Sequence, residues 1–85
     1  MSAEETVAAA VRAYLAQRQA HLGKAAPLPE DADLFDEGVL DSVAITELID
    51  AVEKATGREI DFIDVDPDEL ATVAGIVSEL TEALA

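Results

Sequence analysis

Residues 36–54 read DEGVLDSVAITELIDAVEK, a turn that leads into an amphipathic helix. After the turn, apolar side chains recur at helical spacing along one stripe, which consists of Ile45, Leu48, Ile49 and Val52. The opposite stripe, which must face water or a partner, consists of Val43, Glu47, Asp50 and Lys54. This pattern predicts a helix from about Ser42 to Thr56 that ends at Gly57.

The start of this helix combines a capping residue with a displayed hydroxyl group. Asp41 occupies the N-cap position, where a carboxylate accepts hydrogen bonds from the free amides of the first turn. Ser42 follows at the first helical position, with its hydroxyl outside the apolar stripe. Free N–H groups and the positive end of the helix dipole favour an anion there. Ser42 is therefore well placed to carry a phosphate group.

The rest of the chain predicts three further helices. Ser2 is expected to cap a helix from about Ala3 to Leu22, with Gly23 at its end. The apolar residues of that helix are Val7, Val11, Leu15 and Leu22. A short helix is expected from about Pro67 to Ala71, capped by Asp66, and a last one from about Val73 to Leu84, capped by Thr72. The last helix has its own apolar stripe, which consists of Val73, Ile76, Val77, Leu80 and Leu84.

These elements predict an all-α fold, a four-helix bundle with a short third helix. Residues 23–40 form a long connection between the first two helices, with no sustained periodicity. Loops of this length in compact domains are usually functional or held by their own side chains. Leu28, Leu34 and Phe35 are expected to hold this one against the core.

Composition restricts the classes of function. The length of 85 residues predicts a single domain, residues 1–85, that stands alone rather than as part of a longer synthase. The net charge of −14 argues against binding nucleic acid phosphates and favours basic protein partners. The chain has no cysteine and begins without a signal peptide or an apolar run of membrane length, so that a cytoplasmic monomer is expected.

Catalytic and metal sites find little support. With one histidine and no cysteine, no base is evident to activate Ser42 as a nucleophile. The run Asp64, Asp66, Asp68 resembles the start of a calcium loop, but Glu69 stands at the sixth position and Gly75 at the twelfth. His21 is interpreted as a favourable charge at a helix C-terminus. The chain is expected to be non-catalytic and to have no metal site.

Residues 34–43, LFDEGVLDSV, followed by Glu47, Leu48 and Glu53, resemble the phosphopantetheine attachment region of acyl and peptidyl carrier proteins. The order of the predicted helices also fits that family. The resemblance implies that Ser42 takes a 4'-phosphopantetheine arm from coenzyme A, with Asp41 helping to bind the transferase. The thiol of the arm would then hold an acyl or aminoacyl group as a thioester and present it to partner enzymes.

The implied partners are a phosphopantetheinyl transferase, an enzyme that loads the acyl or aminoacyl group, and downstream synthases or transferases. The residues expected to form the docking face are Leu40, Val43, Thr46, Glu47 and Asp50. Acidic residues on this face are expected to steer basic partners to Ser42. No binding to nucleic acid and no membrane insertion are expected.

Details of the motif bear on the cargo. Two residues, Val39 and Leu40, separate the glycine from Asp-Ser, where fatty-acid carriers usually have one. Val43 replaces the usual leucine, and Asp50 stands where those carriers show a large apolar residue. These features are similar to D-alanyl carriers and to free-standing aminoacyl or specialised-metabolism carriers. Two alternatives remain, a fatty-acid carrier and an unmodified acidic adaptor that binds a basic protein.

Overall fold

The structure is a computed structural model that describes residues 2–23, 29, 31–61, 63 and 65–84. It contains three α-helices, α1 (Ala3–Leu22), α2 (Ser42–Thr56) and α3 (Val73–Leu84), and the 3-10 helix η2 (Pro67–Ala71). Within the described ranges every regular element is helical, which confirms the predicted all-α class.

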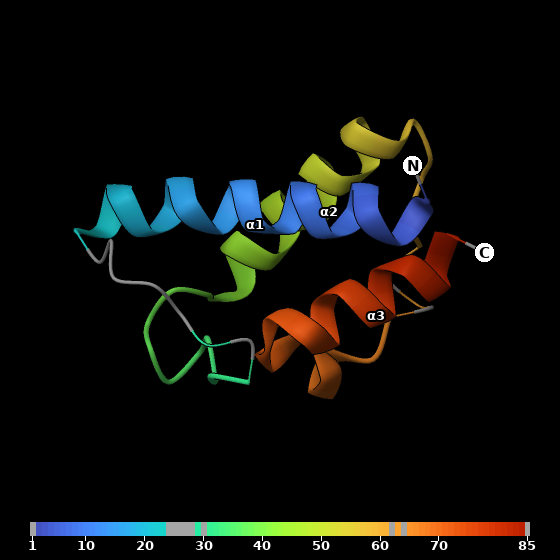
Figure 1. The fold of residues 1–85 in the computed structure, drawn as a ribbon. Helices are drawn as coiled ribbons and strands as arrows, with labels where there is room; N and C mark the ends of the chain where they lie inside the picture. The colour runs from blue at the N-terminus through green and yellow to red at the C-terminus, as the bar shows by residue number, and fades with distance from the viewer. Residues whose placement is uncertain (1, 24–28, 30, 62, 64, 85) are drawn as a thin grey trace.

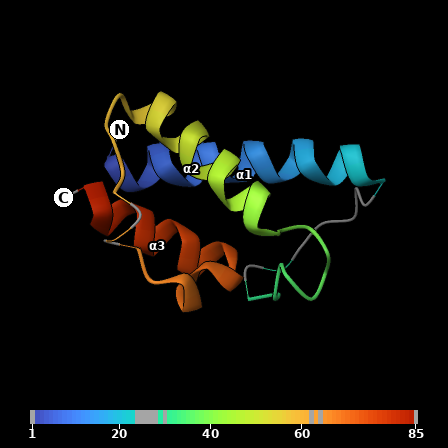
Figure 2. The same ribbon diagram turned by 180° about the vertical axis from the view of Figure 1, so that it is seen from behind.

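The three α-helices form a bundle in which α1 packs against both α2 and α3 (Figures 1 and 2). Residues 31–41, which lead into α2, lie at one end of the bundle, and the start of α1 and the end of α3 lie at the other end (Figure 1). The start of α2 therefore emerges from the loop end, away from both termini.

The helix ends follow the capping residues predicted for them. The Ser2 hydroxyl accepts a hydrogen bond from the Glu5 amide at 3.2 Å. The two glycines that end α1 and α2, Gly23 and Gly57, adopt φ values of 72° and 70°. Such left-handed backbone is easy for glycine and costly for other residues, so each glycine stops its helix.

The expected short third helix occupies the predicted residues but is a 3-10 helix, so the described part of the chain has three α-helices rather than four. Asp66 caps it through the Asp68 amide at 3.0 Å, and Thr72 ends it by adopting extended backbone. The Thr72 hydroxyl in turn accepts from the Gly75 amide at the start of α3. Helical segments as short as this one are often 3-10 helices.

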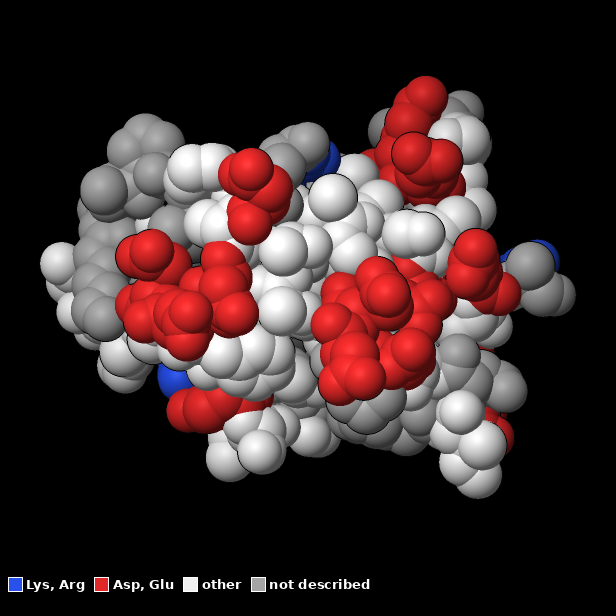
Figure 3. Space-filling view, turned by 90° about the horizontal axis from the view of Figure 1, so that it is seen from below, with Lys and Arg blue, Asp and Glu red and all other residues white. Residues whose placement is uncertain are grey.

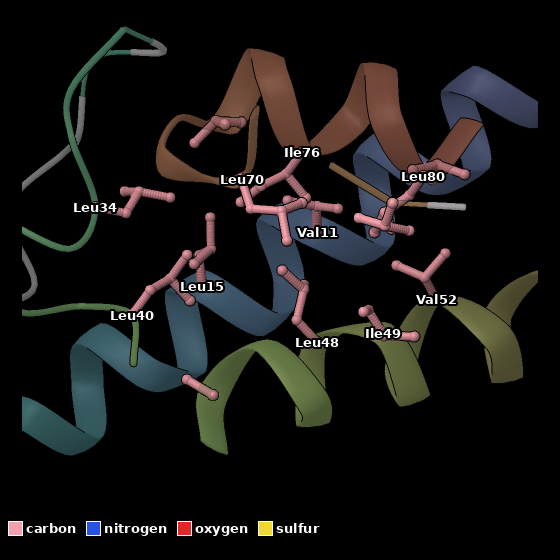
Figure 4. Packing of buried hydrophobic residues seen from close by; sticks show 14 of the residues in the cluster. Val11, Leu15, Leu34, Leu40, Leu48, Ile49, Val52, Leu70, Ile76 and Leu80 are labelled. Atoms are coloured by element: carbon pink, nitrogen blue, oxygen red, sulfur yellow. The ribbon is translucent and has the colours of Figure 1, made fainter. Parts of the chain in front are cut away.

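The core lies between the helices and consists of apolar side chains alone among the described buried residues. Figure 4 shows Leu48, Ile49 and Val52 of α2 facing side chains of α1 and α3. The buried residues are Val7, Val11, Leu15, Leu34, Val39, Leu40, Ala44, Leu48, Ile49, Val52, Ile60, Val65, Leu70, Val73, Ile76, Leu80 and Leu84. Most members of the predicted stripes are among them, while Ile45 and Val77 are half-buried at the edge.

Two expected core residues are instead exposed. Leu22 lies in the last turn of α1, beyond the reach of the other helices, and is 36% exposed. Phe35 is 40% exposed, and only its neighbour Leu34 enters the core. Leu28, the third residue expected to hold the loop, lies outside the described residues.

Leu34 fixes the loop through both its side chain and its backbone. Its amide donates to the Ala71 carbonyl of η2 at 2.7 Å, and its carbonyl accepts from the amides of Val39 and Leu40. The turn between them contains Gly38 at φ 74°. The segment that leads into α2 is therefore tied to the opposite side of the bundle, which sets the position of Ser42.

Candidate functional site

Ser42 is the first residue of α2 and its side chain is exposed to solvent. Asp41 adopts extended backbone at the N-cap, and its Oδ1 accepts from the Ala44 amide at 2.8 Å. The capping interaction predicted from the sequence is therefore present. The first backbone amides of a helix have no acceptor within the helix, so its N-terminal end carries a partial positive charge. The Ser42 hydroxyl lies at this end of α2.

Arg18 on α1 holds this helix start from the other side. Its Nε donates to the Val39 carbonyl, and one terminal NH₂ donates to Asp41 Oδ2, both at 3.1 Å. The side chain of Arg18 is 21% exposed and that of Asp41 60%. One guanidinium thus connects α1 to the loop and to the cap.

Sequence reasoning missed Arg18. The sequence analysis considered the ends and the apolar stripe of this helix but not its arginines, and 21 positions separate Arg18 from Val39. A signal was available, because an arginine three residues after buried Leu15 lies near the buried face of the same helix.

Four of the five residues expected on the docking face are exposed along α2, namely Val43, Thr46, Glu47 and Asp50. Val43 is 67% exposed, a large value for an apolar side chain at the start of a helix. The prediction for Leu40 was wrong: it is 4% exposed and belongs to the core. The amide of Leu40 donates to the Leu34 carbonyl at 3.1 Å, which holds this segment against the core.

Glu47 makes the second polar contact between α1 and α2. The Tyr14 hydroxyl donates to Glu47 Oε1 at 2.8 Å. Burial of the phenol, followed by the hydrogen bond and the negative charge of Glu47, raises the pKa of Tyr14 to about 12. One helical turn further along, the Asp50 carboxylate pairs with Lys54 at 2.9 Å and raises the pKa of that amine.

An open groove of about 680 Å³ runs between these two helices. Its walls are Tyr14, Gln17 and Arg18 from α1 and Thr46, Glu47 and Asp50 from α2. His21, which is exposed in the last turn of α1, also lines the groove. The groove therefore follows the same face of α2 that carries most of the expected docking residues.

Acidic side chains are also exposed on parts of the surface outside α2 (Figure 3). Figure 3 shows them gathered over the loop that leads to α2 and over the side that carries η2, with few basic atoms in view. Even so, no group of acidic or histidine residues in the described chain is arranged to bind a metal ion. No helix in the described ranges is long and apolar enough to cross a membrane.

The family comparison matches a range of the chain that includes Ser42. Residues 9–80 match the family described as phosphopantetheine attachment site, a range that covers most of α1, the loop, α2 and most of α3. The chain belongs to this family. It is a carrier protein that binds 4'-phosphopantetheine covalently through a serine and holds its cargo on that arm as a thioester.

Curated relatives of this carrier include D-alanyl carrier proteins. One from Bacillus velezensis is 40% identical over 52 residues, which cover 61% of this chain and 67% of that protein. One from Bacillus cereus is 36% identical over 52 residues, which cover 61% of this chain and 66% of that protein. The chain thus spans about two thirds of the length of these relatives. The search of solved structures finds no match.

Proposed function

We propose that Ser42 carries the phosphopantetheine arm and that the protein presents an aminoacyl or short acyl group to its partner enzymes. The observation that carries this proposal is the position of Ser42, exposed at the capped N-terminus of α2 within the family match. A phosphodiester there lies beside free amides and the positive end of the helix, which both favour an anion.

The chain has two other serines, and neither offers this setting. Ser78 also lies in the matched residues and is exposed, but it stands in the middle of α3, where the backbone amides are bonded within the helix. Ser2 lies outside the matched residues, and its hydroxyl is engaged as the cap of α1. Ser42 is therefore the favoured attachment site.

Attachment is a reaction of the partner transferase. The Ser42 oxygen attacks the phosphorus that bears the pantetheine, an O–P bond forms, and the pyrophosphate bond of coenzyme A breaks. Adenosine 3',5'-bisphosphate leaves, and the hydroxyl proton passes to a base of the transferase. The role of Asp41 is to hold the helix start in shape and to contribute to transferase recognition, since Oδ1 caps α2 and Oδ2 faces Arg18.

The chain itself is proposed to be non-catalytic. Among the described residues, no side chain accepts a hydrogen bond from the Ser42 hydroxyl, so no base is in place to activate it as a nucleophile. The protein instead supplies a rigid helix end for the arm and an acidic surface for docking. Tethering then raises the effective concentration of the cargo at each docked enzyme.

The cargo is proposed to be an aminoacyl group, of which D-alanine is the first candidate. Two observations support this: the D-alanyl carrier relatives, and the charged residue Asp50 on the exposed stripe of α2. The partners are then a phosphopantetheinyl transferase, a ligase that activates the amino acid, and an enzyme that accepts it. Basic surfaces on these partners would be attracted to the acidic face.

Intact mass after co-expression with a broad-specificity phosphopantetheinyl transferase tests the proposal. We expect wild type and Ser78→Ala to gain the mass of one arm and Ser42→Ala to gain none. Ser78→Ala is a matched control because it also removes one exposed hydroxyl from a helix. An unmodified wild type would favour the adaptor alternative, and a modified Ser42→Ala chain would show that the site is wrong.

A further inference from the structure

The groove between α1 and α2 is charged in a definite order along its length. Arg18 lies at the end nearest Ser42, because its guanidinium contacts Asp41, the residue just before the serine. Glu47 and Asp50 line the groove further along α2. The end of the groove beside the attachment serine therefore holds the guanidinium of Arg18, paired with Asp41, and the far end holds two carboxylates.

The distance between these two ends matches the length of the arm. Asp50 lies eight positions after Ser42 in the same helix, which corresponds to about 12 Å along its axis. The arm has about as many chain bonds between phosphorus and sulfur as a four-residue peptide, so it reaches roughly 14 Å when extended. A thioester on the arm can thus lie beside Asp50 without leaving the surface of the protein.

The middle of the groove suits the middle of the arm. The arm contains two amide groups, and Gln17 and Thr46 line the groove with an amide and a hydroxyl. Thr46 lies one turn after Ser42 and its hydroxyl donates to the Ser42 carbonyl at 3.2 Å. The ring of Tyr14 adds an apolar wall at the level of Glu47, where the two side chains are hydrogen-bonded.

We propose that this groove binds the aminoacyl-loaded arm of the same molecule, with Arg18 beside its phosphodiester and Glu47 and Asp50 binding the cargo's α-ammonium group. The inference rests on the proposed function, because it requires an arm on Ser42. It adds a cargo-binding site on the carrier and a chemical criterion for the cargo, which is a free ammonium group at the end of the arm.

The charged groups of the groove have the capacity for these contacts. Arg18 has five N–H donors, and its bonds to Val39 and Asp41 use two of them. Glu47 accepts from Tyr14 through Oε1, and a carboxylate has further lone pairs on both of its oxygens. An ammonium group of the cargo therefore finds an acceptor without breaking the contact between the helices.

Lys54 is the built-in competitor for Asp50. The two side chains are 2.9 Å apart, but they are 78% and 58% exposed, and exposed ion pairs of this kind are weak. A tethered ammonium group is present at high effective concentration and can replace Lys54. A propionyl group has the same carbon skeleton as alanyl and lacks the amine, so it gains nothing from either carboxylate.

The test compares these two groups on otherwise identical proteins. Alanyl and propionyl are each joined by a stable amide to an amino-pantetheine arm, which a broad-specificity transferase attaches to Ser42, and intact mass verifies complete attachment. The NMR chemical shifts of the backbone amides are then compared between the two isotope-labelled proteins. We expect shift differences between alanyl and propionyl at Thr46, Glu47 and Asp50, and none at Ser78 on α3.

The double variant Glu47→Gln, Asp50→Asn is expected to accept the arm more slowly and, once intact mass shows complete attachment, to lose these differences. The matched control Glu59→Gln, Glu82→Gln removes two exposed carboxylates that do not line the groove and is expected to keep them. Equal shifts for alanyl and propionyl, or differences that survive in the double variant, would overturn the groove proposal alone. A chain that accepts no arm at Ser42 would overturn the proposed function, and the groove proposal with it.

Discussion

Arg18 and Asp41 are joined by an ion pair of 3.1 Å that links the C-terminal half of α1 to the cap of α2. The same guanidinium donates to the Val39 carbonyl, so the two residues fix both the direction in which the loop enters the helix and the side chain that caps it. The serine end of α2 is thereby held by α1 as well as by its own first turn.

Arg18→Ala is expected to destabilise the protein by roughly 1–2 kcal/mol, because it removes two charge-assisted hydrogen bonds from a mostly buried guanidinium. Urea unfolding followed by circular dichroism measures this change. Gln17→Ala is the control, since its side chain is exposed on the same helix. Arg18→Lys should recover part of the loss, because lysine keeps the charge but cannot bridge two acceptors with a planar fork. Equal stability of the Ala variant and wild type would show that the bridge contributes nothing.

The tyrosine of α1 provides a direct reading of the contact between α1 and α2. Tyr14 is the single tyrosine of the chain, so its ultraviolet absorbance reports its ionisation alone. We expect a midpoint near the pKa of about 12 rather than 10.0, and a lower midpoint in Glu47→Gln. Burial should keep the variant's midpoint above 10.0, because burial is the largest cause of the shift.

The raised pKa of Tyr14 also makes the stability of the folded protein depend on pH. The folded protein favours the neutral phenol, so the stabilisation is fully present below pH 10 and is lost as the pH rises through about 12. Tyr14→Phe should remove this dependence. A wild-type midpoint at 10.0 would mean that the phenol does not contact Glu47 in solution.

Charge reversal tests the docking face. Glu47→Lys with Asp50→Lys should slow attachment of the arm and loading of cargo, because basic partners would no longer be attracted to α2. The matched control is Glu59→Lys with Glu82→Lys, which changes the net charge equally with exposed residues away from that face. Added salt should slow the wild type and affect the α2 variant less. Equal rates for both double variants at low salt would place docking on another surface.

The sequence predicted those parts of the fold that depend on local chemistry. The bounds of α1 and α2 were predicted from capping residues and glycines at their ends, such as Asp41 and Gly57, and these interactions are present. The start of α3 was predicted from Thr72, whose hydroxyl accepts from the Gly75 amide. The exposure of Ser42, Glu47 and Asp50 followed from helical periodicity alone. In each case the deciding contact lies within a few positions along the chain.

The errors arose where a residue's position is set by distant segments. Leu40 and Phe35 look alike in a loop without periodicity, yet Leu40 is buried because its amide binds Leu34, and Leu34 is bound to η2. The Arg18 bridge and the groove beside it depend on how α1 crosses α2, which no local pattern encodes.

The last prediction concerns where the cargo lies relative to the core. Val52 and Ile76 are fully buried between the helices, and Val77 is half-buried at the edge. Protein interiors are close-packed, and forcing extra methylene groups into them costs about 1–3 kcal/mol or more. We therefore expect a small cargo to remain outside the bundle.

The position of the cargo can be measured by NMR. The Ser42 arm is loaded with acyl chains of increasing length, and the chemical shifts of the backbone amides in the core are followed. Signals of Val52, Ile76 and Val77 should stay constant, because this core of Val, Ile, Leu and Ala has few large side chains that can rearrange to open a cavity. The protein carrying the bare arm is the control, since it separates effects of the arm from those of the chain. Shifts at these three residues that grow with chain length would show that the acyl chain enters the core, and the small-cargo hypothesis would then have to be abandoned.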